Sequence, residues 1–364
     1  MTPGHGGLLD GVRILDLSVW RPGPYATQLL ADLGADVIKV EPPGGDPMRR
    51  YPELFASLHA NKRSIVLDLK DDHDRARALD LARDADVFVE GYRPGVAARL
   101  GVGYDDVRTV APSIVYCSVS GFGQEGPLAA APGHDLNYQA WSASLSPDGG
   151  DPVPGALPIA DLAGGMAAAF GICAALVRRS ATGEGERIDL AMTDVLATWT
   201  GAATARAEGV ASDVRGVPGY GIFATADGGY VTLGVVSEDH FWRALCDVAG
   251  LADCRDLGFV ERVSRLDELQ ARLADSLRGR DRDELVAELL AAGVPVAPVH
   301  DRLTMLADPH LVARGLVSHG PGEPAAGLQI GHPVRFVQHP AERHRAAPAL
   351  DADRGASFLP RADR

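Results

Sequence analysis

Short runs rich in β-branched residues alternate with amphipathic segments through the first half of this 364-residue chain. A segment such as PYATQLLADLG (24–34) has the 3.6-residue period of a helix that buries one face. Alternation of this kind is typical of βαβ units, which place parallel strands in one sheet. The sequence therefore predicts an α/β fold with buried strands at 12–18, 36–41, 64–70, 86–92 and 113–120.

The pattern changes after about residue 200. The segment YGIFATADGGYVTLGVV (220–236) predicts a hairpin that turns at Asp227-Gly228-Gly229, because Asp-Gly and Gly-Gly pairs favour tight turns between strands. Helices are expected at 239–249, 266–278 and 281–292, and a strand at 294–300. Since a chain of this length exceeds what one core usually holds, we predict a large domain over 1–200, a smaller α+β domain over 201–325, and a return of 326–364 to the large domain.

Composition limits the possible partners and the compartment. A net charge of -14 argues against nucleic acid or an anionic membrane as the main partner, so an anionic ligand would need a local basic pocket. Four cysteines without C-x-x-C spacing predict buried thiols, and with no signal-peptide pattern they indicate the cytoplasm. The most apolar stretch, 162–177, is shorter than a membrane span and predicts a buried helix.

One glycine motif has the spacing of a dinucleotide site. GFGQEG (121–126) follows a predicted strand, as the G-x-G-x-x-G fingerprint requires. However, Pro127 comes directly afterwards, and no acidic residue ends a second strand about 20 residues later. We therefore expect a glycine-rich turn that lines a pocket rather than a nicotinamide or flavin site.

Basic residues lie near several predicted strands. Lys62 and Arg63 come just before one strand, and Arg93 and Arg99 follow another. Ligands bind at the carboxyl ends of parallel strands, and arginine forks suit phosphate. The alternative is that these are ordinary solvated charges, which composition alone favours. Their clustering in a chain with a net charge of -14 leaves both interpretations open.

Asp161 stands directly before an apolar helical segment and has two possible roles. An aspartate in this place is a common helix N-cap, which needs no chemistry. Gly164 and Gly165 follow it, and bare backbone at a helix start offers free amides to a developing oxyanion. A carboxylate there is also in position for catalysis, so cap and catalyst both remain open.

His134 and Asp135 are neighbours in PGHDLNYQ (132–139). Adjacent residues diverge by about 100° on a helix and point to opposite faces of a strand, so the two do not form a catalytic pair by themselves. A catalytic role for His134 requires a partner distant in sequence. A structural histidine is the alternative.

Many collinear segments together resemble the class III CoA-transferase family, and within it the 2-methylacyl-CoA racemase branch. The resemblance covers nearly the whole chain and rests on LLDGVRILDLS, RPGPYATQLLADLGADVIKVEPPGGDPMR, NKRSIVLDLK, DVFVEGYRPGVAARLGV, SVSGFGQEGP, GHDLNY, IADLAGG, GEGERIDLAMTD and DGGYVTLG. It implies a Rossmann-like large domain, a smaller α+β domain, and a homodimer of interlocked subunits. It also implies that Arg93 and Arg99, with Lys62, Arg63 and Arg49, hold the phosphates and adenine end of CoA.

The resemblance implies two alternative activities. In a racemase, His134 and Asp161 would exchange the α-proton of a 2-methylacyl-CoA on opposite faces of an enolate. Racemases of this kind have a glutamate that supports the histidine. Here the ungapped match to that position is Ser237, and Glu238 follows one residue later. In a transferase, Asp161 would be the nucleophile that carries CoA between carboxylic acids. We predict the racemase, with the transferase as the alternative and a non-catalytic CoA-binding protein as a third possibility. No metal and no redox cofactor are expected, since CoA is part of the substrate.

Overall fold

The computed structural model describes residues 7–145, 151–204, 216–319 and 328–360. The chain divides into two compact units. Unit 1 comprises Met1–Ala205 and Pro309–Arg364, and unit 2 comprises Arg206–Asp308. Helix α14 (Pro309–Ala313) and strand β10 (Val317–His319) therefore belong with the large unit, although the sequence placed them in the smaller domain.

Unit 1 is built on a six-stranded parallel sheet with the strand order β3-β2-β1-β4-β5-β6. This is the strand order of a Rossmann fold, in which successive strands are added on one side of β1 as far as β3 and on its other side from β4 onward. The predicted α/β class is confirmed, and β6 is a strand that the sequence analysis missed. The strands are β1 (Arg13–Asp16), β2 (Asp36–Glu41), β3 (Lys62–Val66), β4 (Val87–Glu90), β5 (Val115–Ser120) and β6 (Glu186–Ala191).

Helices cover both faces of this sheet, so successive residues of each strand enter different cores. On β1, Ile14 packs with helices α1 and α7, whereas Leu15 packs with α3 and α5. On β4, Val87 and Phe88 divide in the same way. The helices of this unit are α1 (Pro22–Asp32), α2 (Pro52–His59), α3 (Asp72–Asp84), α4 (Val96–Arg99), α5 (Tyr104–Val110), α6 (Asp135–Trp141), α7 (Ile159–Thr182) and α8 (Met192–Thr204), with the 3-10 helix η1 (Pro47–Arg50).

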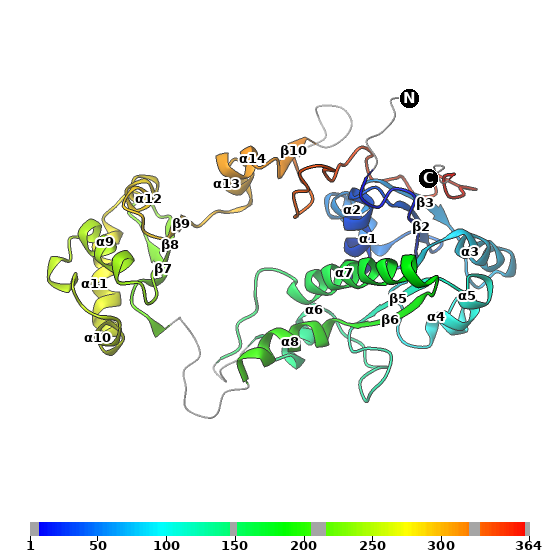
Figure 1. The fold of residues 1–364 in the computed structure, drawn as a ribbon, viewed down its shortest axis with the longest axis horizontal. Helices are drawn as coiled ribbons and strands as arrows, with labels where there is room; N and C mark the ends of the chain where they lie inside the picture. The colour runs from blue at the N-terminus through cyan, green and yellow to red at the C-terminus, as the bar shows by residue number, and fades with distance from the viewer. Residues whose placement is uncertain (1–6, 146–150, 205–215, 320–327, 361–364) are drawn as a thin grey trace. The chain divides into compact units, whose positions relative to one another are not determined.

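Helix α7 contains the apolar stretch that the sequence predicted as a buried helix (Figure 1). By length and composition it is the kind of helix that could cross a membrane, but one face packs on α1, β5 and β6. Glycines allow the close approach: a Cβ on Gly165 would lie 2.6 Å from the Pro22 carbonyl oxygen, and one on Gly164 would lie 2.6 Å from Met192 Cγ. The opposite face of α7 exposes Phe170.

The C-terminal segment packs on the large unit. Strand β10 pairs antiparallel with β11 (Leu328–Ile330). Further along, the Arg345 backbone pairs with Asn61, the Asp353 carboxylate accepts a hydrogen bond from the Ser64 backbone, and Phe358 enters the core beside α3. The described end of the chain thus closes the β3 edge of the sheet.

Unit 2 has its own core around a three-stranded antiparallel sheet, β7-β8-β9. The hairpin turns at Asp227–Gly229, where Gly228 adopts a positive φ of 78°, as predicted. Buried Trp242 and three leucines of α11 fill the core. The elements are β7 (Tyr220–Ala224), β8 (Tyr230–Gly234), α9 (Asp239–Ala249), η3 (Ala252–Cys254), α10 (Phe259–Ser264), α11 (Leu266–Arg278), α12 (Arg282–Ala291), β9 (Val296–Pro298) and α13 (Arg302–Leu306).

Candidate active site

A cavity of about 920 Å³ opens in unit 1 where the strand order reverses. Its walls come from the loops after β1, β4 and β5, together with the start of α6 and the start of α7. Crevices at the carboxyl ends of the strands, at such a switch point, are where ligands bind in open α/β sheets. Both Asp161 and His134 line this cavity, so the structure brings together the two residues that the sequence singled out.

Asp161 lies in the first turn of α7 but does not cap it, because the helix begins at Ile159. The capping group is the carboxylate of Asp135: its Oδ1 accepts hydrogen bonds from the backbone N–H of Ala160 (2.7 Å) and of Asp161 (3.1 Å). The N-cap interpretation of Asp161 is therefore wrong. Because Asp135 does the capping, the carboxylate of Asp161 stays available to the cavity.

The environment of Asp161 favours its protonated form. Burial, together with the negative charge of Asp135, raises the pKa of Asp161 to about 6, while the nearby charges of Arg21 and His134 oppose the rise. The Nε atom of Arg21 lies 3.9 Å from Oδ2 of Asp161. A carboxylate with a pKa near 6 is mostly ionised at neutral pH and more basic than a solvated one, which suits a nucleophile or a general base.

His134 immediately precedes α6, and its ring is exposed. The backbone N–H of His134 donates to Asn137 Oδ1 at 3.0 Å, which fixes the start of this helix. The ring stands edge-on to the indole of Trp20, with centroids 6.5 Å apart. His134 lines the cavity, whereas Asp135 caps α7, so the two neighbours do not form a catalytic pair, as expected.

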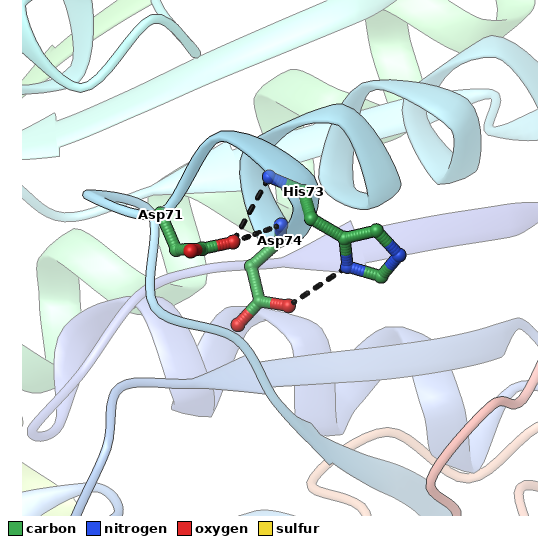
Figure 2. Close-up of side chains that lie close together, drawn as sticks. All are labelled: Asp71, His73 and Asp74. Carbon is green, nitrogen blue, oxygen red and sulfur yellow. Dashed lines mark hydrogen bonds and ion pairs between the residues drawn. The ribbon is translucent and has the colours of Figure 1, made fainter.

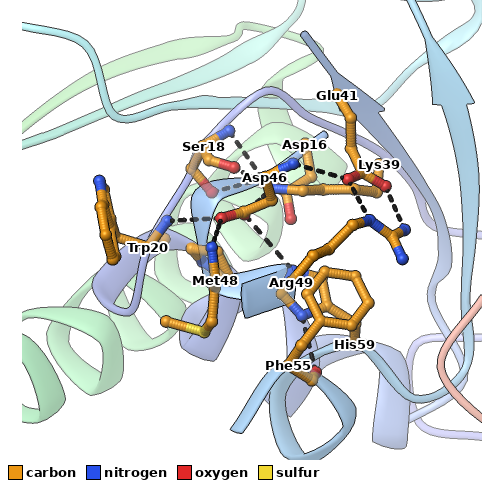
Figure 3. A network of polar contacts seen from close by, with 12 residues as sticks. Asp16, Ser18, Trp20, Lys39, Glu41, Asp46, Met48, Arg49, Phe55 and His59 are labelled. Atoms are coloured by element: carbon orange, nitrogen blue, oxygen red, sulfur yellow. Dashed lines mark hydrogen bonds and ion pairs between the residues drawn. The ribbon is translucent and has the colours of Figure 1, made fainter. Parts of the chain in front are cut away.

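The loop between β1 and α1 carries Trp20 and Arg21, which both line the cavity. Buried charges support this loop on the side of Trp20 (Figure 3). Lys39 and Asp46 form a fully buried ion pair at 3.2 Å, and Lys39 also donates to the backbone oxygen of Ser18. Asp46 Oδ1 accepts the backbone N–H of Trp20 at 3.4 Å. Trp20 has a φ of 66°, a strained value for a residue with a side chain. The buried network holds this strained turn in place.

The predicted oxyanion role of Gly164 and Gly165 is wrong. Both residues lie past the first turn of α7, where backbone N–H groups are used within the helix. Their side-chain-free surface serves the close packing of α7 against α1 and α8. The amides that a helix start leaves open are those of the first turn, and Asp135 takes two of them.

The proposed CoA-binding cations separate into two groups. Arg93 and Arg99 are exposed beyond β4, Arg93 lines the cavity, and neither pairs with a carboxylate in the described part of the chain. Lys62 is completely buried; its Nζ bonds to Asp16, to the Pro24 carbonyl and to Thr27. The prediction for Lys62 is therefore wrong, because no ligand reaches it.

Arg49 and Arg63 are also engaged within the protein. Arg49 forms a two-pronged ion pair with Glu41, its Nη2 at 2.6 Å, and stacks on Phe55 (Figure 3). Arg63 donates to both oxygens of Asp36. Strand β3 begins at Lys62, so Lys62 and Arg63 start a strand and lie away from the carboxyl edge. Already in the sequence they stood before the strand, at its amino end, so the carboxyl-edge argument did not apply to them.

Glu238, the proposed support for His134, belongs to unit 2. It immediately precedes α9, and its Oε2 accepts the backbone N–H of Val236 at 3.2 Å. Hydrogen bonds from backbone N–H groups lower the pKa of Glu238 below its ordinary value. Arg262, which is fully buried, donates to the carbonyls of Val236 and Ser237 and so orders this turn. A catalytic role for Glu238 stays a prediction.

The glycine-rich segment after β5 behaves as a pocket-lining turn. Gly121 lines the cavity, and a Cβ there would lie 2.2 Å from the ring of Tyr138. Gly133 faces the same ring, and Tyr138 donates its hydroxyl to the Gly133 carbonyl at 2.5 Å. The glycines thus make room for a tyrosine of α6 rather than for a pyrophosphate.

A cluster of possible metal-binding groups occurs at the start of α3, away from the cavity (Figure 2). Asp71 caps this helix by accepting the backbone N–H groups of His73 and Asp74. The His73 side chain is 92% exposed, and its Nδ1 lies 3.5 Å from Asp74 Oδ1. Helix capping accounts for this arrangement without a bound ion.

Sequence analysis missed Arg21 and Asp135 as site residues. Arg21 follows β1 by five positions and precedes Pro22 at the start of α1, so its place after a strand at the carboxyl edge was the available signal. Asp135 was considered only as a partner for His134. Its link to α7 spans 25 residues and has no local sequence signal.

Comparison with known proteins gives the family. The model of CoA-transferase family III matches residues 9–354, so this chain belongs to that family. It is similar to an acetyl-CoA:oxalate CoA-transferase of Acetobacter aceti, with 36% identity over 97% of this chain and 95% of that protein. It is also similar to the succinyl-CoA:glutarate CoA-transferase of Homo sapiens, with 32% identity over 94% and 83% of the two chains.

Comparison of the fold with solved structures agrees with this family. A crystal structure of a CaiB/BaiF family protein from Brucella suis superimposes with a TM-score of 0.84 and 27% identity, covering 96% of this chain and 97% of that one. The expected family is thus confirmed, and the protein is an acyl-CoA enzyme of this family. These two relatives, and a similar succinyl-CoA:mesaconate CoA-transferase of Haloarcula hispanica, are named as CoA-transferases, which favours the alternative prediction over the racemase.

Proposed function

We propose that the protein is a CoA-transferase that moves CoA from an acyl-CoA to a free carboxylic acid through Asp161. The observation that carries the proposal is the cavity at the strand switch point, in which the carboxylate of Asp161 is raised in pKa and faces Arg21. The names of the similar CoA-transferases support it.

The reaction begins when Asp161, as carboxylate, attacks the thioester carbon of the acyl-CoA. The carbon–sulfur bond breaks, CoA leaves as thiolate, and a mixed anhydride joins the acyl group to Asp161. The thiolate then attacks the Asp161 carbonyl, which releases the donor acid and leaves an Asp161–CoA thioester. The acceptor acid reverses these steps, so the nucleophile is regenerated and no metal or redox cofactor takes part.

The residues around Asp161 have separate tasks in this scheme. Asp135 holds the backbone of the first turn of α7 and raises the basicity of Asp161 by its charge. Arg21 faces the nucleophile and balances negative charge. Arg93 and Arg99 bind the phosphates of CoA, since they are the members of the predicted set that remain free of ion pairs among the described residues.

A racemase of 2-methylacyl-CoA thioesters is the second candidate. It is favoured by one observation: His134 lines the same cavity as Asp161, close enough for its charge to influence the pKa of Asp161. In that reaction the two side chains would exchange one α-proton through an enolate, and Glu238 would support His134. A CoA-binding protein without catalysis is the third candidate.

We also propose that the enzyme is a cytoplasmic homodimer that requires neither nucleic acid nor membrane. The support for a dimer is the outward face of α7, where Met166, Phe170 and Val177 are 46%, 76% and 71% exposed. Apolar side chains repeated along one helix face are typical of a subunit interface. Light scattering after gel filtration tests the dimer, and a monomer at micromolar concentration would refute it.

One experiment separates the candidate functions. The protein is incubated with a single epimer of a 2-methylacyl-CoA in deuterated water, first alone and then with a panel of carboxylic acids. A transferase gives no α-deuterium but forms new acyl-CoA when the acids are added. Deuterium incorporation with loss of chirality would establish the racemase instead. If neither reaction occurs but the protein still binds CoA, the non-catalytic candidate remains.

The variant His134→Ala gives an independent criterion. A transferase keeps its rate to within a factor of about 3, because His134 makes no bond in the scheme above. A racemase loses roughly 10²- to 10⁴-fold, the contribution typical of a general acid or base.

A further inference from the structure

A second cavity, of about 260 Å³, lies in unit 1 and has no part in the proposed reaction. Its walls belong to strands β10 and β11, to the coil that follows β11, and to the carboxyl end of α1. Helix α1 begins at Pro22, which lines the first cavity, and ends at Asp32, which lines the second. With a rise of 1.5 Å per residue, its 11 residues separate the two ends by about 15 Å. The two cavities are therefore distinct.

Positive charge predominates in this second cavity. The titratable residues that line it are Asp32, Arg314, His332, Arg335 and Arg343. The one carboxylate is already engaged: Asp32 Oδ2 pairs with Arg343 Nε at 3.0 Å, and Asp32 Oδ1 accepts hydrogen bonds from Gln28 and Asn61. Burial raises the pKa of Asp32, while the charges of Arg343 and His332 oppose the rise. The cavity thus has a surplus of cations in a chain whose net charge is -14.

Several hydrogen-bond donors in the cavity have no acceptor. Arg314 and Arg335 are exposed, and neither side chain bonds or pairs with any described residue. The side chain of Arg343 is only 15% exposed, yet its bond to Asp32 uses Nε alone. The four N–H donors on its Nη1 and Nη2 atoms are unused among the described residues. Three guanidinium groups with free donors suit an anion that carries several oxygens, and phosphate above all.

A buried acceptor makes the choice of anion more specific. Gln329 pairs with Ser318 across the β10–β11 ladder, and both residues line the cavity. The Oε1 atom of Gln329 is buried and accepts no hydrogen bond from the described residues, which is costly unless a ligand supplies a donor. Inorganic phosphate keeps a proton on one oxygen at neutral pH and can donate it. Sulfate has no such proton, and a phosphate monoester loses its last proton near pH 6.

We propose that this cavity is a binding site for inorganic phosphate. The guanidinium groups of Arg314, Arg335 and Arg343 hold its oxygens, and Gln329 accepts its remaining proton in a hydrogen bond. A volume of about 260 Å³ lies below the roughly 300–1,000 Å³ of pockets for drug-sized ligands, which agrees with a small ion. Bound phosphate links the β10–β11 hairpin to the end of α1. The inference is independent of the proposed transferase function.

Isothermal titration calorimetry with inorganic phosphate, at low ionic strength and without other multivalent anions, tests the proposal. The wild type should bind one phosphate per chain with a Kd of about 1 mM or less. Arg314→Gln and Arg335→Gln should each weaken binding by roughly 10- to 100-fold, as for a lost hydrogen bond to a charged group. Because both arginines are exposed, the melting temperature without phosphate should not change, which separates lost binding from lost folding.

Two further arginine variants serve as controls. Arg278, on α11 of unit 2, is 68% exposed, so Arg278→Gln should bind phosphate like the wild type. Arg93→Gln should also keep the affinity of the wild type, because Arg93 lines the first cavity. Loss of phosphate binding in Arg93→Gln, with normal binding in Arg314→Gln, would place the ion at the first cavity and overturn the proposal.

The choice of anion has its own test. The wild type should bind sulfate and glycerol 3-phosphate more weakly than phosphate, and Gln329→Leu should remove the preference for phosphate over sulfate. Equal affinity of the wild type for sulfate and phosphate, or tighter binding of glycerol 3-phosphate, would overturn the assignment to inorganic phosphate. No binding at millimolar phosphate, or the same affinity in the wild type, Arg314→Gln and Arg335→Gln, would refute the site as a whole.

Discussion

Replacing Asp161 by asparagine should stabilise the protein while it removes activity. The pKa of Asp161 is about 6 in the folded protein, against an ordinary value of 3.8. Each unit of difference corresponds to about 1.4 kcal/mol, so the ionised carboxylate costs the folded state about 3 kcal/mol at neutral pH. The amide side chain of the Asp161→Asn variant carries no charge and avoids this cost. Active-site groups held in unfavourable surroundings commonly show such an exchange of stability for function.

The dependence on pH follows from the direction of the shift. Below the unfolded pKa the carboxyl group is protonated in both states, and its charge costs nothing. Between pH 3.8 and about 6 the folded state holds the proton that the unfolded state has lost, so the free energy of unfolding of the wild type falls as the pH rises. Above about pH 6 the full cost is present. The advantage of Asp161→Asn should therefore grow from near zero at about pH 4 to about 3 kcal/mol at about pH 8.

Urea unfolding of both proteins at the two pH values, followed by tryptophan fluorescence, measures this difference. Asp72→Asn is a suitable control, because the Asp72 carboxylate is 91% exposed and has no burial cost. Burial and the charge of Asp135 disfavour the ionised carboxylate of Asp161 in the folded protein. A gain in the free energy of unfolding of Asp161→Asn that is equal at both pH values, or a loss at about pH 8, would contradict this explanation.

Three further substitutions test the packing and the corrected cation assignments. Gly165→Ala puts a Cβ 2.6 Å from the Pro22 carbonyl oxygen and should lower the free energy of unfolding by about 1–3 kcal/mol. Gly171→Ala is the control, because its Cβ would have its nearest neighbour at 3.7 Å and should not destabilise the protein. Equal melting curves for the two variants would refute this prediction. Lys62→Met leaves the buried Asp16 short of a partner and should cost about 3–5 kcal/mol in chemical denaturation, against almost nothing for exposed Lys70→Met. Arg99→Gln should raise KM for acyl-CoA by roughly 3- to 10-fold with a smaller effect on kcat in steady-state kinetics, and an unchanged KM would remove Arg99 from the CoA site.

The sequence was informative where one local pattern decides the structure. Strand β2 was predicted with its observed bounds, and the hairpin at Gly228 follows from a turn signal that needs a positive φ. Strand β6 was missed because its first four residues, starting at Glu186, are not buried and do not form an apolar run. Strand β3 begins with Lys62 and Arg63, two charges that a pattern based on apolar runs excludes.

The site was harder to predict, because its parts are joined through space. Asp161 and His134 were found from their types and surroundings, and the fold does place both at one cavity. The cap of α7 comes from Asp135 on another helix, so the sequence assigned it to the nearest aspartate. Lys62 and Arg93 are both basic residues near strands in the sequence, but Lys62 pairs with a buried carboxylate, whereas Arg93 is exposed to solvent. Ion pairs between distant residues leave no local pattern, and they decide which cations remain for a ligand.

The central claim is that Asp161 carries CoA as a covalent thioester, and trapping that intermediate tests it most directly. The protein is incubated with a reactive acyl-CoA in the absence of acceptor acid, treated with hydroxylamine, digested, and its peptides are sequenced by mass spectrometry. The account predicts a hydroxamate at Asp161 that depends on acyl-CoA and does not form in Asp161→Asn. An unmodified Asp161 in protein that transfers CoA normally when an acid is added would contradict the account.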